Sequence, residues 1–216
     1  MKPLISSKPS QAFTVVELLV ITGMVALLAV LLLPTGIHGD KLPASRLGCA
    51  NNLKQIGLAF NMWAIDHGGK YPAAMGTNSG GSLEYIPGGE TFRHFQVVSN
   101  VFTSPKSLIC PADIRKRATN FGVGLSNTNV SYFVGVDAAQ IHPEMFLSGD
   151  RNLTNGATSA SRMLELHTNS VAGWTRQIHV RQGNIGLADG SVQYLSNYRL
   201  KEALRWGGTT NRLAMP

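Results

Sequence analysis

The stretch "CANNLKQIGLAFNMW", Cys49 to Trp63, decides the expected fold of this chain. Its apolar residues Cys49, Leu53, Ile56, Phe60 and Trp63 recur at spacings of 4, 3, 4 and 3. These spacings place them on one face of an α-helix, with the polar residues on the other faces. We expect this apolar stripe to pack on a β-sheet as ordinary core rather than to hold a cofactor.

The ends of this helix are marked by glycine and proline. We predict a helix from about Ala44 to His67, because Gly68 and Gly69 are suited to a left-handed cap and Pro72 follows them. On the other side, residues 34–43 ("PTGIHGDKLP") contain two prolines and two glycines, which disfavour helix interiors. We therefore expect a hinge at 34–43.

Short strand-like runs separated by turn residues follow the helix. The clearest is the last, because Ile185 and Leu187 alternate before Asp189-Gly190 and apolar residues alternate again after it, which favours a β-hairpin. The amphipathic pattern of residues 197–206 predicts a short helix. The strand-like runs are residues 94–99, 107–113, 130–138, 145–150, 176–181 and 184–196.

The longest apolar run precedes the hinge. From Phe13 to Leu33 it contains one charge, Glu17, and as a helix it spans roughly the 30 Å hydrocarbon core of a membrane. We therefore predict a transmembrane helix over 13–33 and an α+β fold, with this long hydrophobic helix followed by an amphipathic helix on a small antiparallel β-sheet. A carboxylate within a membrane costs about 2.5–3.5 kcal/mol at the centre, so Glu17 needs a cation. It either snorkels to the interface or meets an amine released by cleavage before Phe13.

Composition excludes several classes of protein. The 216 residues carry a net charge of +7, which favours anionic partners in general. Cys49 and Cys110 form no C-x-x-C pair, which argues against a zinc ribbon or a thioredoxin-like site, and outside the cytoplasm they are able to form one disulfide. No H-E-x-x-H, G-x-S-x-G or phosphate-loop motif is present, so we expect no enzyme.

The stretch "A-FTVVE" and the apolar run after it resemble the processing site of type IV prepilins and type II secretion pseudopilins. The resemblance implies that a prepilin peptidase cleaves between Ala12 and Phe13 and methylates Phe13, with Ala12 standing where the family usually has Gly. It implies that Glu17 meets the N-terminal amine of an adjacent subunit during assembly. Pro34 stands where many members carry a helix-bending proline.

The rest of the chain resembles a bacterial family of prepilin-like proteins. The segments "RLGCANNLKQIGLAFNMW", "ICPAD", "SYFVGV" and "HVRQGNIGLADGSV" carry this resemblance. The family's ending is a His, nine residues and Asp-Gly, matched by His179 and Asp189-Gly190. Since Asp189 fits a turn and His179 the strand before it, we expect structural roles for both rather than catalysis or metal binding. His142, His167 and Cys110 are the other residues that invite a catalytic or metal interpretation.

The sequence gives less support to a metal site or to a nucleic-acid partner. Some major pseudopilins hold Ca²⁺ in a loop of carboxylates and carbonyls, and Asp137, Asp150 and Asp189 are the candidate oxygen donors here. The basic run 115–117 has no interleaved aromatic residues for base stacking, which argues against a nucleic-acid partner.

The sequence is thus interpreted as a structural pseudopilin-like subunit in the bacterial inner membrane. We expect a leader peptide at 1–12, the transmembrane and assembly helix at 13–33, the hinge at 34–43 and a periplasmic globular domain at 44–216. By the resemblance its partners are prepilin peptidase, other pseudopilin subunits and, indirectly, an inner-membrane platform and an assembly ATPase. The alternative is a membrane-anchored periplasmic module that binds a polymer or DNA and does not assemble.

Overall fold

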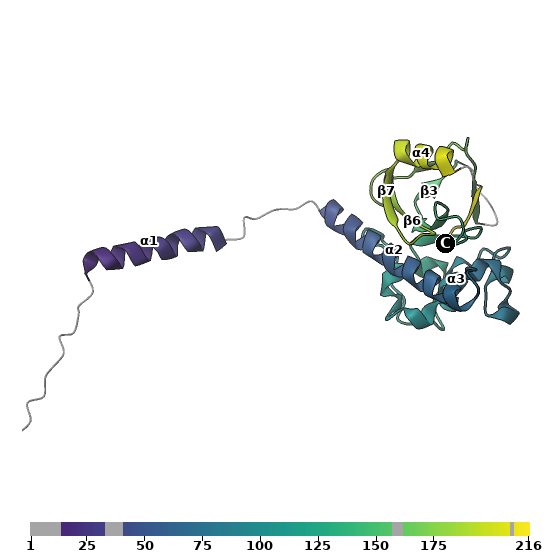
Figure 1. The fold of residues 1–216 in the computed structure, drawn as a ribbon, viewed down its shortest axis with the longest axis horizontal. Helices are drawn as coiled ribbons and strands as arrows, with labels where there is room; N and C mark the ends of the chain where they lie inside the picture. The colour runs from purple at the N-terminus through teal and green to yellow at the C-terminus, as the bar shows by residue number, and fades with distance from the viewer. Residues whose placement is uncertain (1–13, 33–40, 157–161, 208–209) are drawn as a thin grey trace, which may run out of the picture. The chain divides into compact units, whose positions relative to one another are not determined.

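The computed structural model describes residues 14–32, 41–156, 162–207 and 210–216 (Figure 1). The chain divides into two units, with the boundary between Gly39 and Asp40. The described part of the first unit is Thr14 and the helix α1, Val15–Leu32, and the second unit contains the other described helices and strands. The second unit is α+β, with a six-stranded antiparallel sheet.

The first unit corrects the expected membrane segment. In the part of the chain that the structure describes, none of the helices combines the length and the apolar character needed to span a membrane. The 18 residues of α1 extend about 27 Å, short of the ~30 Å hydrocarbon core, and the charged Glu17 lies in the first turn. The prediction of a transmembrane helix over 13–33 is therefore wrong. The same holds for the long membrane helix in the expected fold class and for the expected inner-membrane localisation.

The helix α2, Lys41–Asp66, is longer than the sequence predicts. It begins three residues before Ala44, so that Pro43 lies in its first turn, where a proline costs no intrahelical hydrogen bond. Lys41 to Pro43, expected within the hinge, are therefore helical, while the rest of that segment lies outside the described residues. The helix ends as predicted: Gly69 donates its backbone N–H to Ala64 O, and Gly68 and Gly69 both have positive φ.

The sheet has the strand order β4-β8-β1-β2-β6-β7. The strands β6 and β7 form the predicted hairpin, while β8, close to the C-terminus, inserts between β4 and β1. A separate ribbon pairs β3 with β5. The strands are β1 Tyr132–Gly135, β2 Phe146–Asp150, β3 Leu153–Thr154, β4 Met163–Leu166, β5 Gly173–Trp174, β6 Gln182–Leu187, β7 Val192–Ser196 and β8 Asn211–Ala214.

Each face of the sheet carries its own apolar core. Along β1 the buried side chains alternate: Tyr132 and Val134 belong to the core under α2, and Phe133 belongs to the core under α4, Asn197–Gly207. The helix α2 packs on β2, β6 and β7, and α4 packs on β5 and β7 (Figure 1). The five stripe residues of α2 are all buried, as predicted.

Several predicted strands are not strands. Residues 94–99 lie in α3, Thr91–Val97, and in a 3₁₀ turn; residues 107–113 are a 3₁₀ turn and a loop; and residues 176–181 form a tight turn. Short apolar runs do not distinguish a strand from a single helical turn, since their periodicity is the same over so few residues. The 3₁₀ helices are η1 Pro72–Ala74, η2 Thr77–Ser79, η3 Leu83–Tyr85, η4 Ser99–Val101, η5 Pro105–Leu108 and η6 Asn127–Asn129.

Candidate functional site

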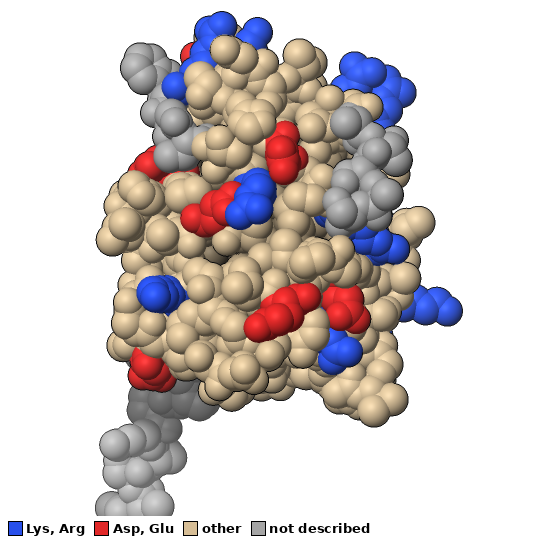
Figure 2. Space-filling model, turned by 90° about the vertical axis from the view of Figure 1, so that its right-hand side faces the viewer, with Lys and Arg blue, Asp and Glu red and all other residues tan. Residues whose placement is uncertain are grey.

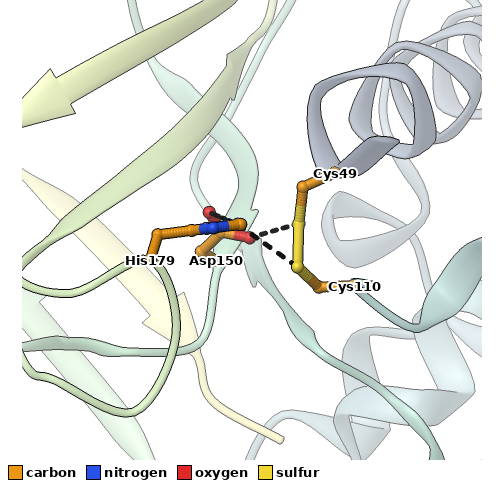
Figure 3. Close-up of side chains that lie close together, drawn as sticks. All are labelled: Cys49, Cys110, Asp150 and His179. Atoms are coloured by element: carbon orange, nitrogen blue, oxygen red, sulfur yellow. Dashed lines mark hydrogen bonds and ion pairs between the residues drawn. A yellow bond between two sulfur atoms is a disulfide. The ribbon is translucent and has the colours of Figure 1, made fainter. Parts of the chain in front are cut away.

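Four side chains able to bind a metal meet in the interior between α2 and the sheet (Figure 3). Cys49 comes from α2, Asp150 from the last residue of β2, Cys110 from the loop after η5, and His179 from the turn before β6. One ligand atom of each lies within 4.8 Å of those of the others, and all four residues are buried. We call these four residues the Cys-Asp-His cluster.

His179 reaches the cluster through an unusual backbone conformation. His179, Val180 and Arg181 all have positive φ, at 54°, 48° and 61°. The left-handed region costs roughly 1–2 kcal/mol for each non-glycine residue, and most for a β-branched one such as Val180. The sequence-based placement of His179 in a strand is therefore wrong. Such strain persists only where surrounding contacts hold it, and it is concentrated at functional sites.

The buried amide of Asn152 supplies those contacts. Its Nδ2 lies within hydrogen-bond distance of three backbone carbonyl oxygens around the turn, those of Thr175 (3.2 Å), Ile178 (2.8 Å) and Gln182 (3.1 Å). The turn is thus fastened on both sides of His179. The His179 side chain is fully buried, and burial, together with the positive charge of Arg46, lowers its pKa to about 4, so the imidazole is neutral at pH 7.

Asp150 is held by the next strand of the sheet. Its Oδ2 accepts hydrogen bonds from the backbone N–H (2.7 Å) and from Nδ2 (3.0 Å) of Asn184 in β6. Complete burial raises the pKa of Asp150 to about 7, against the effect of these two hydrogen bonds. The other oxygen, Oδ1, lies 3.0 Å from Cys49 Sγ.

A disulfide joins Cys49 to Cys110, with 5.0 Å between their Cα atoms. A disulfide sulfur carries no hydrogen, so a hydrogen bond between Cys49 Sγ and Asp150 Oδ1 requires the protonated carboxyl group. The raised pKa of Asp150 is in keeping with that. A second donor is available, since the hydroxyl of Tyr132 lies 3.3 Å from Cys49 Sγ.

The cluster does not have the geometry of a catalytic triad. In a Cys-His-acid triad the nucleophile and the acid contact opposite nitrogens of the imidazole. Here Cys110 Sγ (3.2 Å) and Asp150 Oδ2 (3.6 Å) both lie near Nε2 of His179, and Nδ1 is buried with no hydrogen-bond partner among the described atoms. Complete burial also keeps a substrate away. The arrangement suits a disulfide or a bound ion better than nucleophilic catalysis.

The other half of the His and Asp-Gly motif forms the hairpin turn between β6 and β7. Asp189 Oδ1 accepts the backbone N–H of Ser191 (2.8 Å), and Gly190 has a φ of 83°. Asp189 itself does not have a positive φ, so this is not the two-residue turn that the Asp-Gly pair predicts. Asp189 thus has the structural role expected for it, whereas His179 lies in the cluster.

The three candidate calcium donors lie in different surroundings. Asp137 forms an ion pair with Arg212, whose Nη2 lies 2.5 Å from its Oδ1. Asp189 caps its turn, and only Asp150 belongs to the cluster. The structure therefore does not bring the three carboxylates together in one calcium site. His142, beside Glu144, and His167, beside Thr210, also lie outside the cluster.

The basic run 115–117 is partly turned inward. The guanidinium of Arg115 donates to the backbone oxygens of Asn127, Val130 and Pro216. Burial lowers its pKa to about 10. On the face drawn in Figure 2, Lys and Arg side chains are scattered among Asp and Glu and form no single basic patch.

Glu17 has a local partner that the sequence interpretation missed. Its Oε2 accepts the backbone N–H (2.9 Å) and the hydroxyl (2.8 Å) of Thr14, and the Thr14 hydroxyl lies 3.3 Å from the backbone N of Glu17. This is a capping box, and its T-x-x-E signature is present in the sequence. These hydrogen bonds lower the pKa of Glu17. Ala12, Phe13 and Pro34 lie outside the described residues.

Comparisons with family models, with curated proteins and with solved structures find no match to this chain. The similarity to prepilins therefore rests on the motifs of the sequence. The functional argument has to proceed from those motifs and from the residues of the two units.

Proposed function

We propose that this chain is a structural, pseudopilin-like subunit that is processed between Ala12 and Phe13 and assembles with further subunits through α1. The observation that carries the proposal is the surface of α1. Between Val15 and Val30 its large apolar side chains are 47% to 75% exposed, and they surround the helix rather than forming one stripe. A helix that is apolar on all sides is stable when it is buried on all sides.

The partner that we propose for α1 is the same helix of other subunits. One neighbour covers one stripe of a helix, so an apolar surface on every side calls for several neighbours and hence for a bundle. A filament whose core is made of such helices meets that requirement. The disulfide between Cys49 and Cys110 favours assembly in an oxidising compartment.

Glu17 has a second part in this proposal. Both hydrogen bonds from Thr14 are accepted by Oε2, and among the described residues Oε1 has no hydrogen-bond partner, so it is the oxygen that would face a cation. The amine that processing would create at Phe13 of a neighbouring subunit is such a cation. The capping box then orients the carboxylate, and the hydrogen bonds from Thr14, which lower the pKa of Glu17, favour its charged form.

The capping box decides how the proposal is tested. Replacing Glu17 by Ala removes both the charge and the cap, so failure to assemble would have two explanations. Glu17→Gln removes the charge, but Gln serves in a capping box as Glu does. The chain is produced together with a prepilin peptidase and its assembly machinery, and the subunits in sheared filaments are counted by mass spectrometry.

We expect Glu17→Gln to be lost from filaments and Ile114→Gln, at a residue that is 95% exposed in the second unit, to assemble normally. If Glu17→Gln is incorporated normally and Glu17→Ala is not, Glu17 acts only as a helix cap and its charge has no part in assembly. Absence of filaments with the wild-type chain would contradict the proposal as a whole.

A further inference from the structure

The Cys-Asp-His cluster offers two sulfurs, one imidazole nitrogen and one carboxylate oxygen to a single point in the interior. All three donor types bind Zn²⁺ in proteins, and four ligands are the number that a tetrahedral zinc site takes. The sequence does not reveal it, because its cysteines are 61 residues apart and its four members come from four separate segments. No ligand pair has the short spacing of a zinc motif.

We propose that in the reduced protein Cys49, Cys110, Asp150 and His179 bind one Zn²⁺, and that the disulfide is the metal-free alternative state of the same two sulfurs. The site is thus a redox-controlled zinc site. It is independent of filament assembly, since every ligand lies in the second unit.

The distances fit a tetrahedral ion. Bonds of about 2.0 to 2.3 Å place neighbouring ligand atoms roughly 3.3 to 3.8 Å apart. Cys110 Sγ lies 3.2 Å from Nε2 of His179, and Cys49 Sγ lies 3.0 Å from Oδ1 of Asp150. All four ligand atoms lie within 4.8 Å of one another, so binding requires movements of up to about 1 Å, besides separation of the two sulfurs when their bond is broken.

The surroundings hold the ligands as the outer contacts of a metal site do. Asn184 anchors Oδ2 of Asp150 and so leaves Oδ1 directed at Cys49 Sγ. Asn152 fastens the strained turn that carries His179. Such outer contacts orient the ligands of a metal and raise their affinity for it. A disulfide alone needs neither a buried carboxyl group nor a strained turn that directs an imidazole at it.

The charge of the loaded site is close to balanced. Two thiolates, one carboxylate and a neutral imidazole around Zn²⁺ sum to −1. Arg46, whose positive charge acts on His179, provides a nearby compensating charge, and its Nε is buried with no hydrogen-bond partner among the described atoms.

Conversion of the disulfide state to the zinc-binding state requires a reductant, and a dithiol supplies the two electrons and two protons that are needed. The dithiol breaks the bond between the two cysteine sulfurs, gives them two electrons and two protons, and is itself oxidised to a disulfide. Binding of Zn²⁺ then displaces the two thiol protons to solvent. An open pocket of about 510 Å³ reaches the chain neighbours of the two cysteines, because its lining includes Gly48, next to Cys49, and Ile109 and Pro111, on either side of Cys110. Both cysteines are fully buried behind this lining, so reduction requires a local opening there.

The first test needs no variant. The full-length chain is prepared in two portions, one reduced with a phosphine under anaerobic conditions and one left oxidised, and both are freed of metal. Each is titrated with Co²⁺, followed by its visible absorption, and then with Zn²⁺. We expect the reduced portion alone to give the intense spectrum of tetrahedral, thiolate-bound Co²⁺, which one equivalent of Zn²⁺ removes. A reduced protein without that spectrum, or an oxidised protein with the same spectrum, would overturn the proposal.

Variants then assign the ligands. Asp150→Asn and His179→Gln should each weaken Zn²⁺ binding of the reduced chain by more than the ~10- to 100-fold that loss of an outer contact costs. Asp137→Asn and His142→Gln, which alter an Asp and a His outside the cluster, should bind as the wild type does. Wild-type affinity in both ligand variants, with circular dichroism showing that they fold, would refute a four-ligand site.

Discussion

Reduction of the disulfide between Cys49 and Cys110 should destabilise the second unit strongly when metal is withheld. The bond closes a long loop, since its cysteines are 61 residues apart. In the chain-entropy description, a loop of that length removes about 14 cal/mol/K from the unfolded state, or about 4 kcal/mol at 25 °C. No side chain is lost on reduction, so the loss of stability reports the cross-link rather than a cavity.

The assay is thermal unfolding of the wild-type chain, oxidised or reduced with a phosphine, in the presence of a chelator. For a unit of this size, a change of 1 kcal/mol in the free energy of unfolding changes the melting temperature by roughly 2–4 °C. We therefore expect reduction to lower the melting temperature by about 8–16 °C. The double variant Cys49→Ala, Cys110→Ala is the control, and the reductant should leave its melting temperature unchanged. Equal melting temperatures of oxidised and reduced wild type would show that the bond does not restrain the chain in solution, and would refute the reasoning.

Two further predictions concern buried polar groups in the second unit. Burial lowers the pKa of His94 to about 4, so below pH 6.5 the unfolded state takes up a proton that the folded state refuses. Between pH 7 and pH 5 the free energy of unfolding of the wild type should therefore fall by about 2 kcal/mol because of this residue. The variant His94→Asn, which keeps a partner for Ser82, should show a fall that is smaller by that amount in urea unfolding. An identical fall in both proteins would contradict this. Asn152→Ala should lower the free energy of unfolding by about 1–3 kcal/mol, because it leaves buried carbonyls unpaired, and should increase proteolysis at 175–182. The control Asn100→Ala, at an exposed residue, should change neither the stability nor the proteolysis. Unchanged protease resistance of Asn152→Ala would show that the turn is held by other contacts.

The regular parts of the second unit follow from the sequence. The apolar stripe of α2 is repeated over four helical turns, which is enough to fix a helix and its buried face. The β6 and β7 hairpin follows from alternation on both sides of a turn signal. These features depend on neighbours in sequence, and local propensity is sufficient to predict them.

The strands near the C-terminal end were harder to predict. Residues 163–166 and 211–214 are too short to show alternation, and they become strands only because β8 pairs with β1 and β4 across the sheet. Residues 107–113 are apolar enough for a strand but contain Pro111 and form a loop. Long-range pairing decided these segments, and a single sequence does not display it.

The cluster was missed for a related reason. The sequence marks Asp150 as a candidate calcium donor, His179 as a motif residue with an expected structural role and the two cysteines as a possible disulfide, and nothing in it indicates that the four meet. What unites the four is a left-handed turn at three non-glycine residues, which no local propensity predicts. The capping box at Thr14 and Glu17 is different, since its signature was legible in the sequence and offers Glu17 a partner within its own chain.

The N-terminus of the mature protein is the most direct test of the subunit account. The chain is produced with and without a prepilin peptidase, and its intact mass and N-terminal peptide are measured by mass spectrometry. The account predicts a chain that begins at N-methylated Phe13 only when the peptidase is present. A terminus at Met1 in both samples would contradict it.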